Sequence, residues 1–315
     1  MEIKQLRQFL AVMDEGNFAA AARATGLTSQ AIGRSIQKLE SELGVELFER
    51  HQRSVVPTEF ARTLEKHARR IIVQHRAAQE ELGAMDENSV GEVRVAIGGS
   101  LAGEVGPLAI CRFQEKYPRI RVSLIGGLTE TLIRELRRGR IDFVAGVATP
   151  DWHADEELRT ENLFAVGTHV IAGRDHPLAG EQDVTMEQLA KFPWIVASAR
   201  IGETGPLPLL EVFVGAGVKP PQRLVYSNAV SGAMGLLTNG PFLSLTVPHA
   251  VPESVVGPAG SEAPLVYLDF EWPSASFMAT LTYRAGVTLA KPAQLLANEI
   301  TQAAHELYDT GAQSP

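Results

Sequence analysis

The sequence contains a single cysteine, Cys111, among its 315 residues. One cysteine cannot form a disulfide within the chain, and such sparse use is typical of proteins from a reducing compartment. Because Cys111 stands in a helical pattern close to Phe113, we expect it to be a small core residue rather than a reactive thiol.

Long apolar runs and a leader sequence are also missing. No run reaches the roughly 20 apolar residues that a transmembrane helix needs. The first ten residues, MEIKQLRQFL, lack the apolar centre and the cleavage site of a signal peptide. We therefore expect a cytoplasmic protein without a membrane partner.

Motifs that are typical of catalysis and cofactor binding are absent as well. The chain has no P-loop, HExxH, paired CxxC or GxSxG motif, and its eight histidines show no metal-ligand spacing. The glycines within residues 98–103 do not have the GxGxxG register of a dinucleotide site. We therefore expect no enzyme, no cofactor and no metal centre.

Length and charge indicate several units with different partners. A chain of 315 residues, with 45% hydrophobic residues and a net charge of −8, is expected to form two or three units with a sizeable core. Ten basic and six acidic residues lie between Arg23 and Arg76, so this segment carries +4 and the remainder carries −12. A basic head on an acidic body suits a protein whose head binds nucleic acid.

Residues 17–50 have the pattern of two helices joined by a tight turn. Asn17, and then Thr28 or Ser29, are side chains that cap helix N-termini. Gly26 can adopt the left-handed conformation that ends a helix sharply. The apolar residues of the second helix have spacings of four, three and four, namely Ile32, Ile36, Leu39 and Leu43. This is the layout of a DNA-reading helix-turn-helix, although by spacing alone such a pair more often forms plain core.

The residues within this pattern closely resemble the N-terminal domain of LysR-type transcriptional regulators. The resemblance is ungapped over the first sixty or so residues, and it is carried by Ala21-Ala22, Gly26, Ile36, the LExxLGxxLFER motif from Leu39 to Arg50, and Thr58. It implies a winged helix-turn-helix whose second helix enters the major groove. The chain departs from the family pattern at Ser29-Gln30, at Gly33 and at Phe60-Ala61. The first two departures lie on the face that should meet DNA.

We expect the DNA contacts to come from one face of the second helix and from the wing. Gln30, Arg34 and Lys38 are four residues apart and share a face that points away from the apolar positions. An arginine can bind guanine or phosphate, and a glutamine can pair with adenine. The expected DNA-binding residues are Thr28, Ser29, Gln30, Gly33, Arg34, Lys38, Arg50 and Arg53.

A long helix is predicted from its cap, Thr58, to about Met85. Its apolar face repeats at alternating spacings of three and four, at Ala61, Leu64, Ala68, Ile71, His75, Ala78, Leu82 and Met85. This seam favours pairing with a second copy of the chain, with a single amphipathic helix on a core as the alternative. The family resemblance also implies dimerisation through this linker helix, and a dimer of dimers. We place a DNA-binding domain at 1–58 and a linker helix and hinge at 59–90.

From residue 91 the pattern changes to short apolar strands that alternate with helices. Such a pattern predicts parallel sheets with covered faces. Two sets of these elements predict a two-lobed α/β effector domain of the periplasmic-binding-protein-like (type 2) kind at 91–315. We place lobe I at about 91–161 and 268–308, and lobe II at about 162–267. Segments 113–118, 136–142, 173–178 and 193–195 resemble the effector domain of LysR-type regulators.

A ligand in such a domain is expected beyond the carboxyl ends of the strands, where helices begin. Ser100 and Thr129 each follow a predicted strand and a pair of glycines. Either hydroxyl could instead be a plain helix cap, whereas the family resemblance implies effector contacts at both. The expected effector-binding residues are Ser100, Leu101, Thr129, Val147, Arg200, Ile201 and Gly202. We expect them to hold a small anionic organic molecule.

The sequence thus predicts an all-α winged helix-turn-helix with a long linker helix, followed by a two-lobed α/β effector domain. The expected protein is a homodimer or homotetramer that binds double-stranded promoter DNA and responds to a small-molecule effector. Two alternatives stay open, namely a DNA-binding regulator that needs no ligand and an enzyme with an autoregulatory DNA-binding domain.

Overall fold

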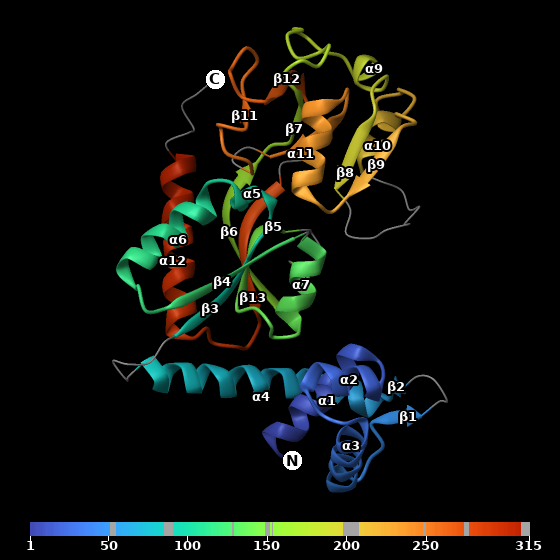
Figure 1. Ribbon diagram of the computed structural model, residues 1–315, viewed down its shortest axis with the longest axis vertical. Coiled ribbons are helices and arrows are strands. Elements are labelled where there is room, and N and C mark those ends of the chain that lie inside the picture. Colours follow the sequence, from blue (N-terminus) through green and yellow to red (C-terminus); the bar gives the residue numbers. More distant parts are fainter. Residues whose placement is uncertain are drawn as a thin grey trace. The chain divides into compact units, whose positions relative to one another are not determined.

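The computed structural model describes residues 1–50, 55–84, 91–127, 129–148, 152, 154–197, 208–247, 250–273 and 277–309 (Figure 1). Its contacts divide the chain into two compact units. The N-terminal unit begins at Met1 and includes the long helix that ends at Ala84. The larger unit contains most of the residues from Gly91 onwards. Among the described residues, no helix is long and apolar enough to cross a membrane.

The N-terminal unit begins with three short helices whose ends are set by local side chains and glycines. They are α1 (Ile3–Glu15), α2 (Phe18–Thr25) and α3 (Ser29–Leu43). Asn17 Oδ1 accepts from the Ala20 N–H at 2.7 Å, and Thr28 Oγ1 accepts from the Ala31 N–H at 3.2 Å, so these side chains cap α2 and α3. Gly26 ends α2 with a φ of 67°, which glycine adopts without a steric penalty.

A two-stranded antiparallel wing comes after α3, formed by β1 (Phe48–Arg50) and β2 (Val55–Pro57). Glu40 of α3 holds the approach to the wing, because its carboxylate accepts from the backbone N–H groups of Leu47 at 2.8 Å and Phe48 at 3.3 Å. The Phe48 ring then packs on Phe9 of α1, with ring centroids 5.6 Å apart. The helices and the wing therefore share one core.

The predicted apolar seam of the long helix α4 (Glu59–Ala84) is buried at the start of the helix and exposed further along it. Ala61 and Ala68 are fully buried in the core of the N-terminal unit, and Leu64 packs against the same core. Further along the helix, Ile71 and Leu82 are 36% and 68% exposed. The first three positions of the predicted pairing seam are therefore occupied within the chain, whereas Ile71 and Leu82 of the seam are open to another copy.

The first sheet of the larger unit has five strands in the order β4-β3-β5-β13-β6. They are β3 (Glu92–Ile97), β4 (Arg121–Gly126), β5 (Phe143–Ala148), β6 (Leu158–Val166) and β13 (Phe277–Arg284). Strands β4, β3 and β5 are parallel, and β13 runs antiparallel to both β5 and β6. The three parallel carboxyl ends therefore share one edge of the sheet.

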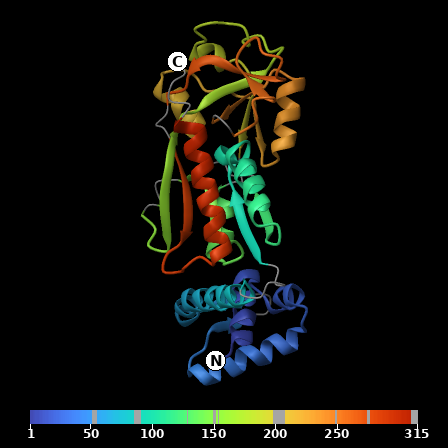
Figure 2. The ribbon, with the colours of Figure 1, turned by 90° about the vertical axis from the view of Figure 1, so that its left-hand side faces the viewer.

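Helices cover both faces of this sheet (Figures 1 and 2). They are α5 (Gly99–Ala102), α6 (Val105–Lys116), α7 (Thr129–Arg137) and α12 (Lys291–Asp309). Helix α12 packs beside α6 on one face, whereas Leu132 and Leu136 of α7 pack on Val144 of β5. Cys111 of α6 is exposed, so its predicted core position was wrong. The buried face of α6 holds Ala109 and Phe113, and Cys111 lies two residues from each, on the opposite side of the helix.

The second sheet has six strands in the order β11-β12-β7-β10-β8-β9. They are β7 (His169–Gly173), β8 (Trp194–Ala197), β9 (Leu224–Ser227), β10 (Leu243–Thr246), β11 (Val256–Gly257) and β12 (Leu265–Glu271). The chain leaves the first sheet after Val166 and returns to it at Phe277. Both crossings lie a few residues beyond the predicted lobe boundaries of about 161 and 268.

The second sheet is covered by α9 (Met186–Leu189), α10 (Pro208–Gly215) and α11 (Val230–Asn239). Trp194 and Phe213 are fully buried, and Trp272 joins them at ring-centroid distances of 5.6 and 5.8 Å. The third tryptophan of the chain, Trp152, is buried against the first sheet. All three tryptophans thus report on the larger unit alone.

We expect His176 to make the larger unit less stable in mild acid. Its side chain is 6% exposed, its Nδ1 accepts from the Leu178 N–H at 3.1 Å, and burial lowers its pKa. The unfolded imidazole titrates near pH 6.5. Below that pH the unfolded state binds the proton more readily, so the stabilisation present above about pH 6.5 is lost as the pH falls.

This prediction can be measured by urea unfolding at several pH values, monitored by tryptophan fluorescence. His176→Asn keeps an acceptor for the Leu178 N–H but does not titrate, so its stability should fall less between pH 7 and pH 5. Burial also lowers the pKa of His169, and therefore part of the pH dependence should persist. Equal slopes for the variant and the parent protein would contradict the assignment to His176.

Candidate DNA-binding helix and ligand-binding loops

The predicted reading face of α3 lies on the surface of the N-terminal unit. Ile32, Ile36 and Leu39 are fully buried. The predicted DNA-binding side chains at the helix start and on the opposite face are all exposed, namely Thr28, Ser29, Gln30, Arg34 and Lys38. Because the apolar residues fix the rotation of α3 against the core, they also fix which polar residues face outwards.

Lys38 differs from the other members of this face because it already has acidic neighbours. Its Nζ lies 3.1 Å from Glu2 Oε1 and 3.8 Å from Glu42 Oε1. The hydrogen bond to Glu2 raises the pKa of Lys38 above its ordinary value. A phosphate would have to compete with these carboxylates for Lys38. The sequence offered no sign of the Glu2 contact, since 36 residues separate the two side chains.

Gly33 stands in the middle of α3, and a methyl group there would meet no heavy atom within 4 Å. Glycine inside a helix is less stable than alanine by roughly 0.5–1 kcal/mol. We therefore expect Gly33→Ala to stabilise the N-terminal unit by about that amount.

Urea unfolding monitored by circular dichroism measures the effect of Gly33→Ala, and Ala31→Gly serves as the matched change in the opposite direction. A fall in specific DNA affinity that accompanies the gain in stability would place Gly33 within the DNA interface. A loss of stability would contradict the open environment of this residue.

The wing is described only at its two strands. Arg50 ends β1, and its backbone is paired with Val55 of β2. Arg53 lies outside the described residues, so its predicted DNA contact stays a prediction.

The predicted ligand-binding residues of the first lobe come together at one edge of the first sheet. Ile97 of β3 is in register with Gly126 of β4 and with Ala145 of β5. Helix α5 begins two residues after Ile97, and α7 begins three residues after Gly126. The chain positions of Ser100 and Thr129 therefore both lie beyond the carboxyl ends of adjacent parallel strands, and Val147 lies near the end of the third parallel strand, β5.

Close backbone packing shapes this edge. The Gly98 N–H donates to the Ala145 carbonyl at 2.7 Å, and a Cβ on Gly146 would lie 3.3 Å from the Gly98 Cα. Behind the edge, the buried Thr280 hydroxyl donates to the Gly146 carbonyl at 3.0 Å. Leu101 is fully buried, so its side chain belongs to the interior beneath this edge. The small residues let two loops and three strand ends approach one another.

The predicted ligand-binding residues of the second lobe, Arg200, Ile201 and Gly202, lie outside the described residues. The strand that leads to them, β8, lies between β10 and β9 in the second sheet and is parallel to both. Its carboxyl end at Ala197 is therefore an interior strand end of the kind at which α/β proteins bind ligands.

A winged helix-turn-helix, a long helix and a body of two α/β sheets together define a DNA-binding regulator with a separate ligand-binding module. The family described as bacterial regulatory helix-turn-helix proteins, lysR family, matches residues 3–62, and the LysR substrate binding domain matches residues 86–305. The chain belongs to the LysR family and is a LysR-type DNA-binding transcriptional regulator.

Relatives agree with this assignment, and a solved structure shares the fold. The chain is 31% identical to the HTH-type transcriptional regulator ShiR of Corynebacterium glutamicum over 70% of this chain and 74% of that protein. It is 32% identical to the HTH-type transcriptional regulator ClcR of Pseudomonas putida over 81% of this chain and 84% of that protein. A full-length OxyR variant from Pseudomonas aeruginosa has the same fold, with a TM-score of 0.63 and 18% identity over 97% of this chain and 95% of that one.

Proposed function

We propose that this regulator is controlled by a small anionic organic effector, which binds where the carboxyl ends of β3, β4 and β5 meet. The observation that supports the proposal is the register of β3, β4 and β5, which puts the starts of α5 and α7 beyond the carboxyl ends of adjacent parallel strands. Hydroxyl groups and helix-start N–H groups favour an anion. Binding changes DNA affinity only as far as the effector prefers one arrangement of the protein over another.

A thermal-shift screen of aromatic and aliphatic carboxylates tests the effector class, with hits repeated in a footprint on the DNA upstream of the gene for this protein. We expect a hit to raise the melting temperature and to alter the footprint, and Ser100→Ala with Thr129→Val to abolish both effects. If no carboxylate changes either measurement, the regulator acts without such a ligand. If a bound compound is turned over, the body has catalytic activity.

Within the DNA-binding unit, we propose that Gln30 and Arg34 read bases and that Lys38 has a lesser part. Gln30 and Arg34 are exposed on the outer face of α3, whereas Lys38 is held by Glu2 and Glu42. Arginine pairs with two acceptors of guanine at once, and glutamine forms a similar pair of hydrogen bonds with adenine.

We expect Arg34→Ala to weaken specific DNA binding by about 1–3 kcal/mol and to relax the preference for one base pair. Lys38→Ala should cost less and should alter the salt dependence instead of the base preference, because a phosphate contact releases counterions. Fluorescence anisotropy titrations at several salt concentrations measure both effects. An unchanged affinity and base preference in Arg34→Ala would remove this residue from the reading face.

We also propose that α4 pairs two copies of the chain, so that two reading helices reach successive turns of DNA. The support is the exposed apolar face of the second half of α4, which contains Ile71, Ala78 and Leu82. Apolar residues exposed along one face of a long helix are typical of a helix that pairs with another.

A further inference from the structure

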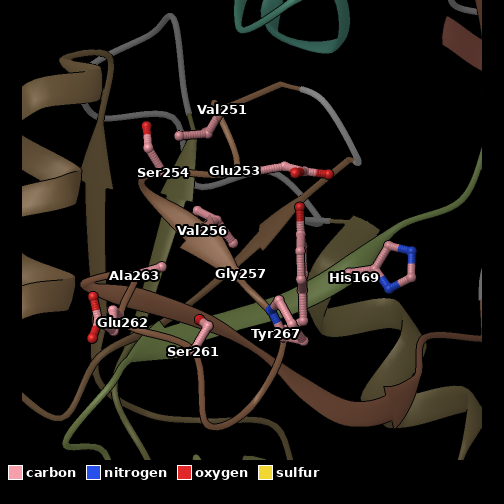
Figure 3. Close-up of a pocket in the computed structure, with 11 residues that line it drawn as sticks. His169, Val251, Glu253, Ser254, Val256, Gly257, Ser261, Glu262, Ala263 and Tyr267 are labelled. Atoms are coloured by element: carbon pink, nitrogen blue, oxygen red, sulfur yellow. The ribbon is translucent and has the colours of Figure 1, made fainter.

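The second sheet has a pocket along β12 that is separate from the edge of the first sheet described above. It has a volume of about 860 Å³ and lies between the segment from Val251 to Pro258 and strand β12 (Figure 3). Its walls are residues of the second sheet and of the loops beside it. Nothing in the proposed effector binding uses them.

The pocket is lined by apolar residues on its floor, by two aromatic rings on one wall and by two carboxylates. Val256, Gly257 and Ala263 are buried and form an apolar floor. The rings of Tyr267 and His169 form an aromatic wall, with their centroids 5.4 Å apart at an angle of 63°. Two carboxylates, from Glu253 and Glu262, complete the lining.

The charged side chains that line the pocket are all negative. In the described part of the chain, neither Lys nor Arg contributes to the lining, and neither Glu253 nor Glu262 has a salt bridge through its side chain. Burial lowers the pKa of His169, so this ring is neutral at pH 7. Burial and the charges of Glu104 and Glu253 raise the pKa of Tyr267, so its hydroxyl keeps its proton.

The two carboxylates are not equivalent. Arg174 donates from Nη1 to the Glu262 carbonyl at 2.9 Å, which places a cation beside that end of the pocket. At the other end, the Tyr267 ring extends from β12 towards the Glu253 carboxylate (Figure 3). Attraction for a positive charge is therefore greatest beside the Tyr267 ring at the end where its hydroxyl points towards Glu253, since the face of an aromatic ring carries negative charge density.

We propose that this pocket binds a small organic cation, an alkyl- or arylammonium compound, with its charged nitrogen between Glu253 and the Tyr267 ring. The hydrocarbon part lies over the floor of Val256, Gly257 and Ala263. The Ser261 hydroxyl lies in the same wall and is buried, without a hydrogen-bond partner among the described residues.

The position of the pocket gives such a ligand a route to influence the arrangement of the two sheets. His169 is the first residue of β7, directly after the chain crosses from the first sheet, and a register shift occurs after Tyr267 in β12 before the chain crosses back. The ligand therefore contacts β7 and β12, the two strands of the second sheet at which the chain arrives from the first sheet and leaves for it again. Its chemical class is opposite in charge to that of the proposed effector.

Three phenyl compounds of similar shape test the proposal by calorimetric titration of the full-length protein. They are phenethylammonium, 2-phenylethanol and 3-phenylpropionate, which are cationic, neutral and anionic. We expect phenethylammonium to bind at least about tenfold more tightly than the other two. Absence of phenethylammonium binding, or equal binding of the alcohol, would overturn the proposal. Tighter binding of a lysine-rich peptide would do so too, because it would identify the pocket as a protein docking site.

Substitutions then locate the bound cation. Glu253→Gln and Tyr267→Leu should each weaken phenethylammonium binding at least about tenfold, whereas Tyr267→Phe keeps the aromatic face and should preserve it. Glu211→Gln removes an exposed carboxylate of α10 and is the matched control. Melting temperatures show whether each variant is folded. Unchanged binding in folded Glu253→Gln and Tyr267→Leu would place the cation elsewhere. Because the readout is direct binding, it does not depend on whether an anionic effector exists.

Discussion

Replacing Leu82 by Lys is expected to weaken self-association of this regulator by more than about 100-fold. Leu82 is 68% exposed near the end of α4. Burial of one leucine side chain contributes about 1.5–3 kcal/mol, and a symmetric dimer buries two copies. Loss of about 3 kcal/mol or more corresponds to at least two powers of ten in the dissociation constant. DNA sites with two half-sites should lose affinity in parallel.

The spacing of the exposed residues of α4 also indicates the direction of pairing. Phe60 and Leu82 are each eleven residues from Ile71, and these three are the large apolar side chains of α4 that are exposed among its described residues. At 100° per residue, an interval of eleven residues returns to within about 20° of the same face. In an antiparallel pair related by a two-fold axis, Ile71 meets its own copy and Phe60 meets Leu82 of the second copy.

A charge exchange tests both the pairing and its direction. Phe60→Glu combined with Leu82→Lys should restore the dimer that either single change weakens, because the new charges meet only in the antiparallel pair. Gln79→Lys places the same charge elsewhere on the helix surface and should leave the dimer intact. Light scattering over a range of concentrations measures the dissociation constant. A dimer that tolerates Leu82→Lys would show that another surface associates.

The caps and the core of the reading head could be predicted because they depend on neighbours in the chain. Asn17 and Thr28 cap helices within three residues of themselves, and Ile32, Ile36 and Leu39 define a buried face by spacing alone. The alternation of short strands and helices in the larger unit could be predicted from similar local patterns, whereas the division of residues 158–173 into β6 and β7 of different sheets could not. Local signals of this kind reach only as far as one helix or one strand.

Contacts between distant segments could not be predicted. The seam of α4 has one continuous repeat, yet α1 covers its first half and leaves Ile71 and Leu82 open. Lys38 donates a hydrogen bond to Glu2, which is 36 residues away in the chain, so a DNA phosphate would have to compete with Glu2 for Lys38. The pocket beside Tyr267 requires β11, β12 and β7 to be neighbours. In each case the sequence pattern predicts which residues share one face of an element, but only the three-dimensional fold shows which distant segment packs against that face.

Arg284 is the clearest example of a residue that only the fold explains, and its replacement should have the other large effect. Its side chain is 9% exposed at the end of β13. Its Nη1 donates to the Leu136 carbonyl at 2.7 Å and to the Ile141 carbonyl at 2.6 Å. The first of these carbonyls belongs to the last turn of α7, where backbone acceptors have no partner within the helix and a cation is favourable.

We expect Arg284→Ala to destabilise the larger unit by about 2–5 kcal/mol, because it leaves buried carbonyl groups without a donor as well as a cavity. Arg284→Lys keeps the charge but has a single donor atom, so it should recover only part of the loss. Arg159→Ala removes an arginine whose side chain is 70% exposed, and should change stability by less than about 1 kcal/mol. Urea unfolding monitored by tryptophan fluorescence reports the larger unit selectively.

The same variants separate a local role of Arg284 from a role in effector binding. Helix α7 begins at Thr129, beside the proposed effector edge, and ends at Arg137, where Arg284 holds it. If the helix moves as one piece, loosening its end in Arg284→Lys should weaken effector binding more than the loss of stability alone explains. An effector affinity that is unchanged in folded Arg284→Lys protein would limit this arginine to a structural role.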